Sequence, residues 1–153
     1  MKKLVFILVL LFIICGCDKD NSDKFYLSDK YYGDGEYIKV KSNSIKKNSH
    51  DSYVLFTYNN YCSLAVPCED VFEDFMKDNN IDFLSIPFED FKDTYLYDTI
   101  KYGPSVVIVN NGKIVAYLDA NDDVDLEKYQ DVDKFKEWIS EYIYLESSVQ
   151  FYD

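Results

Sequence analysis

The sequence contains 153 residues, of which 48% are hydrophobic and 29% are charged. Such a length and composition are typical of a globular chain with one domain of ordinary size. The 28 acidic residues outnumber the 16 basic residues, so the formal net charge is −12. A surface of this sign repels phosphate backbones, which excludes nucleic acid as an expected partner.

The first residues have the pattern of a secretory leader. Met1-Lys2-Lys3 is positively charged, and the apolar run from Leu4 to Ile14 is too short for a bilayer-spanning helix, which needs about 20 residues. The run leads into Cys15-Gly16-Cys17 and then into polar sequence. A small residue directly before such a cysteine resembles the bacterial lipobox, which implies cleavage before Cys17 and a diacylglyceryl group on its sulfur. The alternative is a plain signal peptide or an N-terminal anchor helix.

The lipobox resemblance implies three segments: a lipoprotein signal peptide at 1–16, a polar tether at 17–30 and a folded domain at 31–153. Two acyl chains are enough for stable anchoring, so the mature protein is expected on the extracytoplasmic face of the cell membrane, held by its lipid. Cys15 would be removed and Cys17 capped, which leaves Cys62 and Cys68 as the thiols of the domain. In an oxidising compartment such a pair is expected to form a disulfide.

Apolar segments with the composition of strands alternate with helical patterns along the domain. Strands are predicted at 36–40, 53–58, 81–86, 105–109 and 113–118. Helices are predicted from Pro67 to residue 78, around 94–100, and after a cap at Asp131, while residues 42–48 form a weak helix or turn. Asn111-Gly112 predicts a tight hairpin turn between the last two strands. Trp138 lies on the apolar face of the last helix and is interpreted as a core residue.

The predicted order β-β-α-β-α-ββ-α places the chain in the α/β class, with a central mixed β-sheet flanked by helices. Three features in this order resemble the thioredoxin superfamily. An aromatic residue and a cysteine, Tyr61 and Cys62, follow the strand YVLFTY; an amphipathic helix comes next; and Gly103-Pro104 opens the strand SVVIV, like the cis-proline loop of that family. The chain resembles in particular the thioredoxin-like lipoproteins of low-GC Gram-positive bacteria.

The resemblance implies a thioredoxin-like fold and possible thiol–disulfide exchange through Cys62 and Cys68. It also implies that Gly103, Pro104 and Tyr61 contact the substrate, an extended thiol or disulfide client protein. It implies neither a cofactor nor a metal. The alternative is a non-catalytic thioredoxin-fold binding module in which the Cys62–Cys68 disulfide is structural.

The cysteine spacing departs from the Cys-x-x-Cys of the family, because five residues separate Cys62 from Cys68. Aligning the strand makes Cys62 the nucleophile and puts Phe56 at the position of the family's buried acid. Aligning Pro67 and Cys68 on the family's Pro-Cys puts Asn59 there instead.

The start of the helix decides whether the two cysteines can be joined. A helix that began near Cys62 would separate Cys62 from Cys68 by about 9 Å of rise, too far for a disulfide, which needs Cα atoms within about 7 Å. A helix that begins at Pro67 would leave Cys62 on a loop able to fold back.

The local charges do not favour a reactive thiolate. Neither cysteine has a Lys or His beside it in the sequence, and Glu69 and Asp70 follow Cys68. The start of a helix at this point partly offsets those acids. A peroxiredoxin-like peroxidase is disfavoured, since the chain contains no Arg.

Metal sites are not predicted either. Asp119-x-Asn121-x-Asp123 imitates the start of a calcium loop, but Val124 stands where that loop needs Gly and Gln130 where it needs Glu. His50 is the only histidine and lies in a polar stretch.

The leader generates a test of anchoring. Replacing Cys17 with Ser should release the domain from membranes on fractionation, because the acyl chains have no sulfur to attach to. Membrane association that persists in an uncleaved precursor would identify a simple anchor helix instead.

Overall fold

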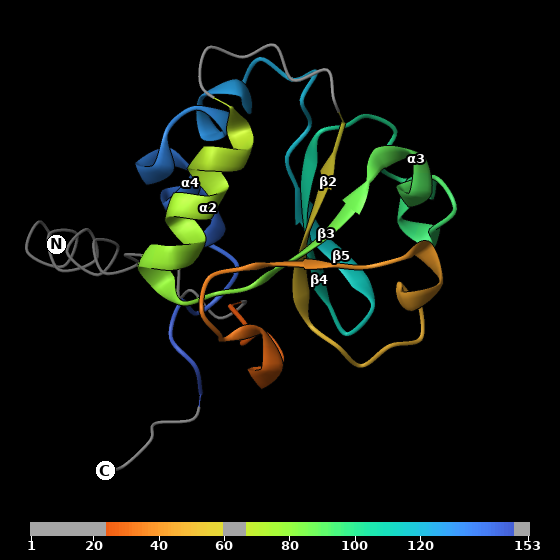
Figure 1. Ribbon diagram of the computed structural model, residues 1–153, viewed down its shortest axis with the longest axis horizontal. Coiled ribbons are helices and arrows are strands. Elements are labelled where there is room, and N and C mark those ends of the chain that lie inside the picture. The colour runs from red at the N-terminus through yellow and green to blue at the C-terminus, as the bar shows by residue number, and fades with distance from the viewer. Residues whose placement is uncertain (1–23, 60–66, 149–153) are drawn as a thin grey trace, which may run out of the picture.

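The computed structural model describes residues 24–59 and 67–148 of the chain. The predicted leader, Cys17, Tyr61 and Cys62 lie outside the described residues. A five-stranded sheet runs through the middle of the molecule, with helices on both of its faces (Figure 1).

The sheet is mixed, as predicted. Its strands are β1 (Tyr37–Lys39), β2 (Tyr53–Tyr58), β3 (Phe83–Pro87), β4 (Ser105–Asn110) and β5 (Lys113–Tyr117). Their spatial order is β1-β3-β2-β4-β5, in which β3 is parallel to both β1 and β2, and the remaining pairs are antiparallel. β2 lies at the centre and is buried from Tyr53 to Thr57, which agrees with its nearly continuous apolar sequence.

Two helices share one face of the sheet, and two short helical segments cover the other. α2 (Cys68–Asn79) and α4 (Val132–Ile139) pack side by side, and α3 (Phe88–Phe91) lies across the sheet from them, followed by the 3₁₀ segment η4 (Tyr95–Asp98) (Figure 1). Three further 3₁₀ segments are η2 (Asp29–Tyr31), η3 (Ser42–Ser44) and η5 (Leu126–Tyr129). Among the residues described, no helix has both the length and the apolar character needed to cross a bilayer.

The core between α2, α4 and the sheet is aromatic. The ring of Phe135 on α4 lies 4.6 Å from that of Phe72 and 5.0 Å from that of Phe75, both on α2. Phe83 on β3 and Trp138 complete the contacts around Phe135, at 6.2 and 5.7 Å. The apolar stripes predicted for the two helices therefore face each other, and Trp138 is a core residue as expected.

The connection from β3 to β4 differs from the single short helix predicted at 94–100. α3 begins at Phe88, directly after β3, and Thr94 is extended (φ −96°, ψ 157°) before η4 starts. The Thr94 hydroxyl donates to the Phe91 carbonyl at 2.8 Å, which closes α3 and competes with its continuation. β3 itself is shifted from the predicted 81–86, because Ile81 forms only an isolated bridge with Tyr32.

The end of the predicted tether packs on the domain. Leu27 is 2% exposed, Phe25 forms a bridge with Ile143, and Lys30 forms an ion pair with Asp51 at 2.7 Å. The polar composition of residues 17–30 concealed these contacts, which are made with residues far away in the sequence. Contacts with the domain therefore extend N-terminally of residue 31, as far as Phe25.

The hairpin turn between β4 and β5 has the predicted chemistry. Asn111 and Gly112 both have positive φ, 50° and 73°, as a type I′ turn requires. A Cβ on Gly112 would lie 2.3 Å from the Lys47 carbonyl oxygen, so glycine is needed here for space as well as for backbone conformation.

The start of α4 generates a stability prediction. The Asp131 carboxylate accepts hydrogen bonds from the backbone N–H groups of Asp133 (2.9 Å) and Lys134 (3.1 Å). Replacing Asp131 with Ala should lower the free energy of unfolding by about 1 kcal/mol in urea titrations. The control Lys136→Ala, at an exposed position of the same helix, should change it by less than about 0.5 kcal/mol.

Candidate functional site

Several chain segments meet at one edge of the sheet. β2 ends beside the beginning of β4, where Thr57 pairs with Ser105, and β5 ends alongside them, where Tyr117 pairs with Val107. α2 begins at the same edge (Figure 1). Either alignment of the cysteine pair on the thioredoxin family places the candidate site at this edge of the sheet.

Cys68 is the first residue of α2, and Pro67 is its N-cap. The helix thus begins where Pro67 predicted, which removes the geometric objection to a pair six positions apart. The Cys68 side chain is 1% exposed and belongs to the hydrophobic core. This burial shields the Cys68 sulfur from solvent. Cys62 itself lies outside the described residues.

Two tyrosines lie near Cys68. Tyr37 on β1 donates its hydroxyl proton to the Glu69 carbonyl oxygen at 3.2 Å. Burial raises the pKa of Tyr37, and the nearby acids and the Cys68 thiol raise it further. Burial also raises the pKa of Tyr129, with Cys68 as the next cause. Both phenols therefore remain protonated and can donate to backbone carbonyl oxygens, that of Glu69 for Tyr37 and that of Pro104 or Leu118 for Tyr129.

A carboxyl group occupies neither of the two positions that the registers assigned to the family's buried acid. Phe56 is 2% exposed, and its ring lies 5.2 Å from that of Phe72. Asn59, directly after β2, is a neutral amide. A surface hollow of about 230 Å³ opens beside Phe56; its lining is Tyr37, Lys39, Phe56, Tyr58, Glu69 and Ser85.

The Gly103–Pro104 peptide bond is cis, as the resemblance to the cis-proline loop implied. Pro104 is buried, and Gly103 packs so closely on α3 that a Cβ there would lie 2.5 Å from the Phe88 ring. The Ser105 hydroxyl donates to the Tyr102 carbonyl at 2.7 Å, which closes the loop before β4. The position of Cys62 relative to this loop lies outside the described residues.

Tyr129 is a site residue that sequence reasoning missed. Its hydroxyl lies 3.0 Å from the Pro104 carbonyl oxygen and 3.0 Å from that of Leu118. Its ring packs edge-on against Phe72 of α2, with centroids 5.7 Å apart. The signal in the sequence is weak: Tyr129 is a large aromatic residue inside a stretch rich in acidic side chains.

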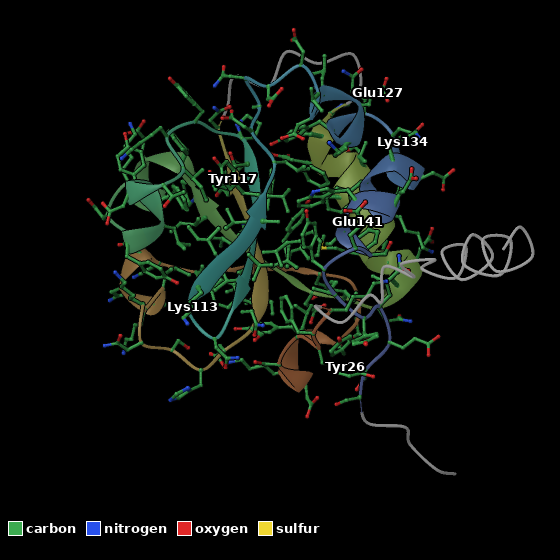
Figure 2. The ribbon with its side chains drawn as sticks, turned by 180° about the vertical axis from the view of Figure 1, so that it is seen from behind. Tyr26, Lys113, Tyr117, Glu127, Lys134 and Glu141 are labelled. Atoms are coloured by element: carbon green, nitrogen blue, oxygen red, sulfur yellow. The ribbon has the colours of Figure 1, made fainter. Side chains whose placement is uncertain are left out.

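The surroundings of the site are acidic. Glu69 and Asp70 are exposed in the first turn of α2. In the segment between β5 and α4, Asp125 accepts from the Asp119 backbone N–H and pairs with Lys128 at 2.7 Å. Figure 2 shows Glu127 on η5, Lys134 on α4 and Glu141 just after α4, at the surface of this side of the molecule. The described residues bring together no group of three or more His, Cys, Asp or Glu that could hold a metal ion.

Solved structures of thioredoxins are similar to this chain. A variant of thioredoxin from Halobacterium salinarum NRC-1 has a TM-score of 0.52 and 16% identity, covering 75% of this chain and 97% of that protein. Schistosoma mansoni thioredoxin has a TM-score of 0.49 and 14% identity, covering 72% and 99%. No protein-family model matches the chain, and no curated protein sequence matches it. The first similarity, with the mixed sheet and its flanking helices, shows that the fold is α/β and thioredoxin-like.

The burial of Cys68 generates a prediction about its reactivity. In the reduced Cys62→Ser protein, iodoacetamide should label Cys68 at least about 100-fold more slowly under native conditions than in denaturant, because labelling requires local opening. Peptide mass spectrometry over a time course measures the two rates. Similar rates in both conditions would show that the first turn of α2 is open in solution.

Proposed function

We propose that the protein is a membrane-anchored, extracytoplasmic thioredoxin-like protein that exchanges thiols and disulfides through Cys62 and Cys68. The observation that carries this proposal is the start of α2 at Cys68, on the sheet edge that also holds the Gly103–Pro104 loop. The thioredoxin-like fold supports it, although a fold alone assigns no chemistry.

The proposed exchange proceeds in two displacements. The Cys62 thiolate attacks one sulfur of a client disulfide, forming a mixed disulfide and releasing the other client sulfur as a thiolate. The Cys68 thiolate then attacks the Cys62 sulfur and releases the second client thiolate. Two electrons pass from the cysteine pair to the client, and the pair ends as the Cys62–Cys68 disulfide.

The proposed clients are extended segments of thiol or disulfide proteins. Gly103 and Pro104, with Tyr61, would form the contact surface for such a segment. A backbone edge binds an extended peptide through main-chain hydrogen bonds, which demands little of the client's sequence.

The proposed location rests on the leader sequence. Lys2 and Lys3, the apolar run and Gly16-Cys17 together support lipidation at Cys17. A diacyl anchor would hold the domain at the outer face of the membrane, in a compartment where a cysteine pair becomes oxidised.

A second candidate function, a binding module with a structural disulfide, is favoured by one specific observation. Phe56 and Asn59 occupy the two positions where the family would place its buried carboxyl, so neither position supplies a proton acceptor beside the cysteine pair. Under this alternative the Cys62–Cys68 bridge holds the β2–α2 connection and exchanges with nothing.

Paired cysteine variants test exchange. Cys68→Ser should accumulate mixed disulfides through Cys62, because the sulfur that would resolve them is gone. Cys62→Ser should accumulate far fewer, since the remaining Cys68 is shielded. Non-reducing gels of membranes quenched in acid, followed by identification of the Cys62 adducts, measure the difference.

The reduction potential separates the two candidates. A catalytic pair should equilibrate with dithiol buffers above about −300 mV, whereas a structural disulfide lies below that value. If the oxidised protein resists strong dithiol reductants and neither variant traps a client, the redox function is wrong and the binding module stands.

A further inference from the structure

We propose that Asn59 and Tyr129 are positioning residues that hold the Gly103–Pro104 backbone in place for an extended client. This inference rests on the proposed exchange and extends it to two residues to which the mechanism above assigns no chemical step. It also assigns a role to the segment between β5 and α4, which otherwise has the composition of a surface loop.

The two side chains hold adjacent carbonyl groups from different parts of the fold. The Asn59 amide nitrogen donates to the Gly103 carbonyl oxygen at 2.6 Å. The Tyr129 hydroxyl lies 3.0 Å from the next carbonyl oxygen along the chain, that of Pro104. The same hydroxyl lies 3.0 Å from the Leu118 carbonyl oxygen, at the end of β5. The loop is thus tied to the end of β2 by one side chain and to η5 by the other.

Side chains can hold this part of the backbone through hydrogen bonds to its carbonyl groups. Pro104 has no N–H group, so the 103–104 peptide offers its neighbours only acceptors. Each carbonyl oxygen has two lone pairs, and a bond from Asn59 still leaves one on Gly103 for a client. A loop held before the client arrives loses less conformational freedom on binding, which improves affinity.

Tyr129 is placed to connect this loop with α2. Between Asp119 and Asp131, all of which the structure describes, Tyr129 is the only buried residue. Its ring packs on Phe72, one turn after Cys68. A protonated phenol is required for the hydrogen bond, and burial raises the pKa of Tyr129, which keeps its proton in place.

The experiment compares Tyr129→Phe and Asn59→Ala with matched controls. Tyr95→Phe removes another tyrosine hydroxyl that donates to a backbone carbonyl, that of Gly112 at 2.9 Å, at the opposite end of β4. Asn79→Ala removes another amide that donates to a backbone carbonyl, that of Phe75 at 2.7 Å, at the far end of α2. Each mature protein is assayed with insulin, with dithiothreitol as the electron source. The small aromatic disulfide 5,5′-dithiobis(2-nitrobenzoate) reacts directly with dithiothreitol, so it is mixed in a single turnover with pre-reduced protein from which dithiothreitol has been removed.

Positioning predicts a split between the two substrates. The KM for insulin should rise about fivefold in Tyr129→Phe and in Asn59→Ala, which corresponds to the loss of one hydrogen bond, while kcat changes little. The rate with the small disulfide, which has no peptide backbone to bind, should stay within about twofold of the parent. Both controls should leave both substrates unchanged. Amide hydrogen exchange at Gly103 and Ser105 should also accelerate about fivefold in the two variants alone.

Different results would contradict the proposed thiol–disulfide exchange and the positioning role of Asn59 and Tyr129. A parent protein that reduces neither substrate overturns the proposed function and this inference with it. A parent that reduces both substrates, with insulin parameters unchanged in Tyr129→Phe and Asn59→Ala, overturns only the positioning role. Equal losses with insulin and with the small disulfide would also overturn it, because they would indicate general damage to the site.

Discussion

The packing of Phe135 against Phe72 and Phe75 is the interaction on which the rest of the structure depends. These three rings join α4 to α2, and aromatic pairs at such distances contribute about 0.5–1.5 kcal/mol each beyond the area they bury. Phe72 lies one turn after Cys68, so the same packing seats the first turn of α2 against the sheet. Tyr129 also packs on Phe72, which extends the aromatic core to the edge of the sheet where the candidate site lies.

Neutral groups surround the buried part of the site, and acidic side chains lie at the surface around it. Tyr37 and Tyr129 remain protonated because burial raises the pKa of each, and the position of Phe56 supplies no carboxylate. Glu69 and Asp70 oppose a thiolate at Cys68, whereas the start of the helix favours one. Because position 56 holds no carboxylate, protons released during thiol–disulfide exchange would have to pass to solvent or to the client.

The chain between β5 and α4 shows how a solvated segment can contribute one residue to a site. Its exposed side chains include several acids, and Asp125 is engaged with Lys128 and with the backbone of Asp119. Within residues 119–131 Tyr129 alone is buried, and its hydroxyl lies close to carbonyl groups from two other segments. The segment is consequently attached to the loop at Pro104 by a specific bond and not only by chain connectivity.

The sequence by itself determined the features that depend on neighbours along the chain. A nearly continuous apolar run located β2, helical periodicity located the buried stripe of α2, Pro67 located the start of that helix, and Asn111-Gly112 specified the turn. Only the tertiary structure decided the features that depend on distant partners. Leu27 is buried by residues that the tether pattern could not reveal, and the hydrogen bonds of Asn59 and Tyr129 join positions 44 and 25 residues apart. Local patterns record which face of an element is apolar, but a polar side chain finds its acceptor only when the fold brings the two together.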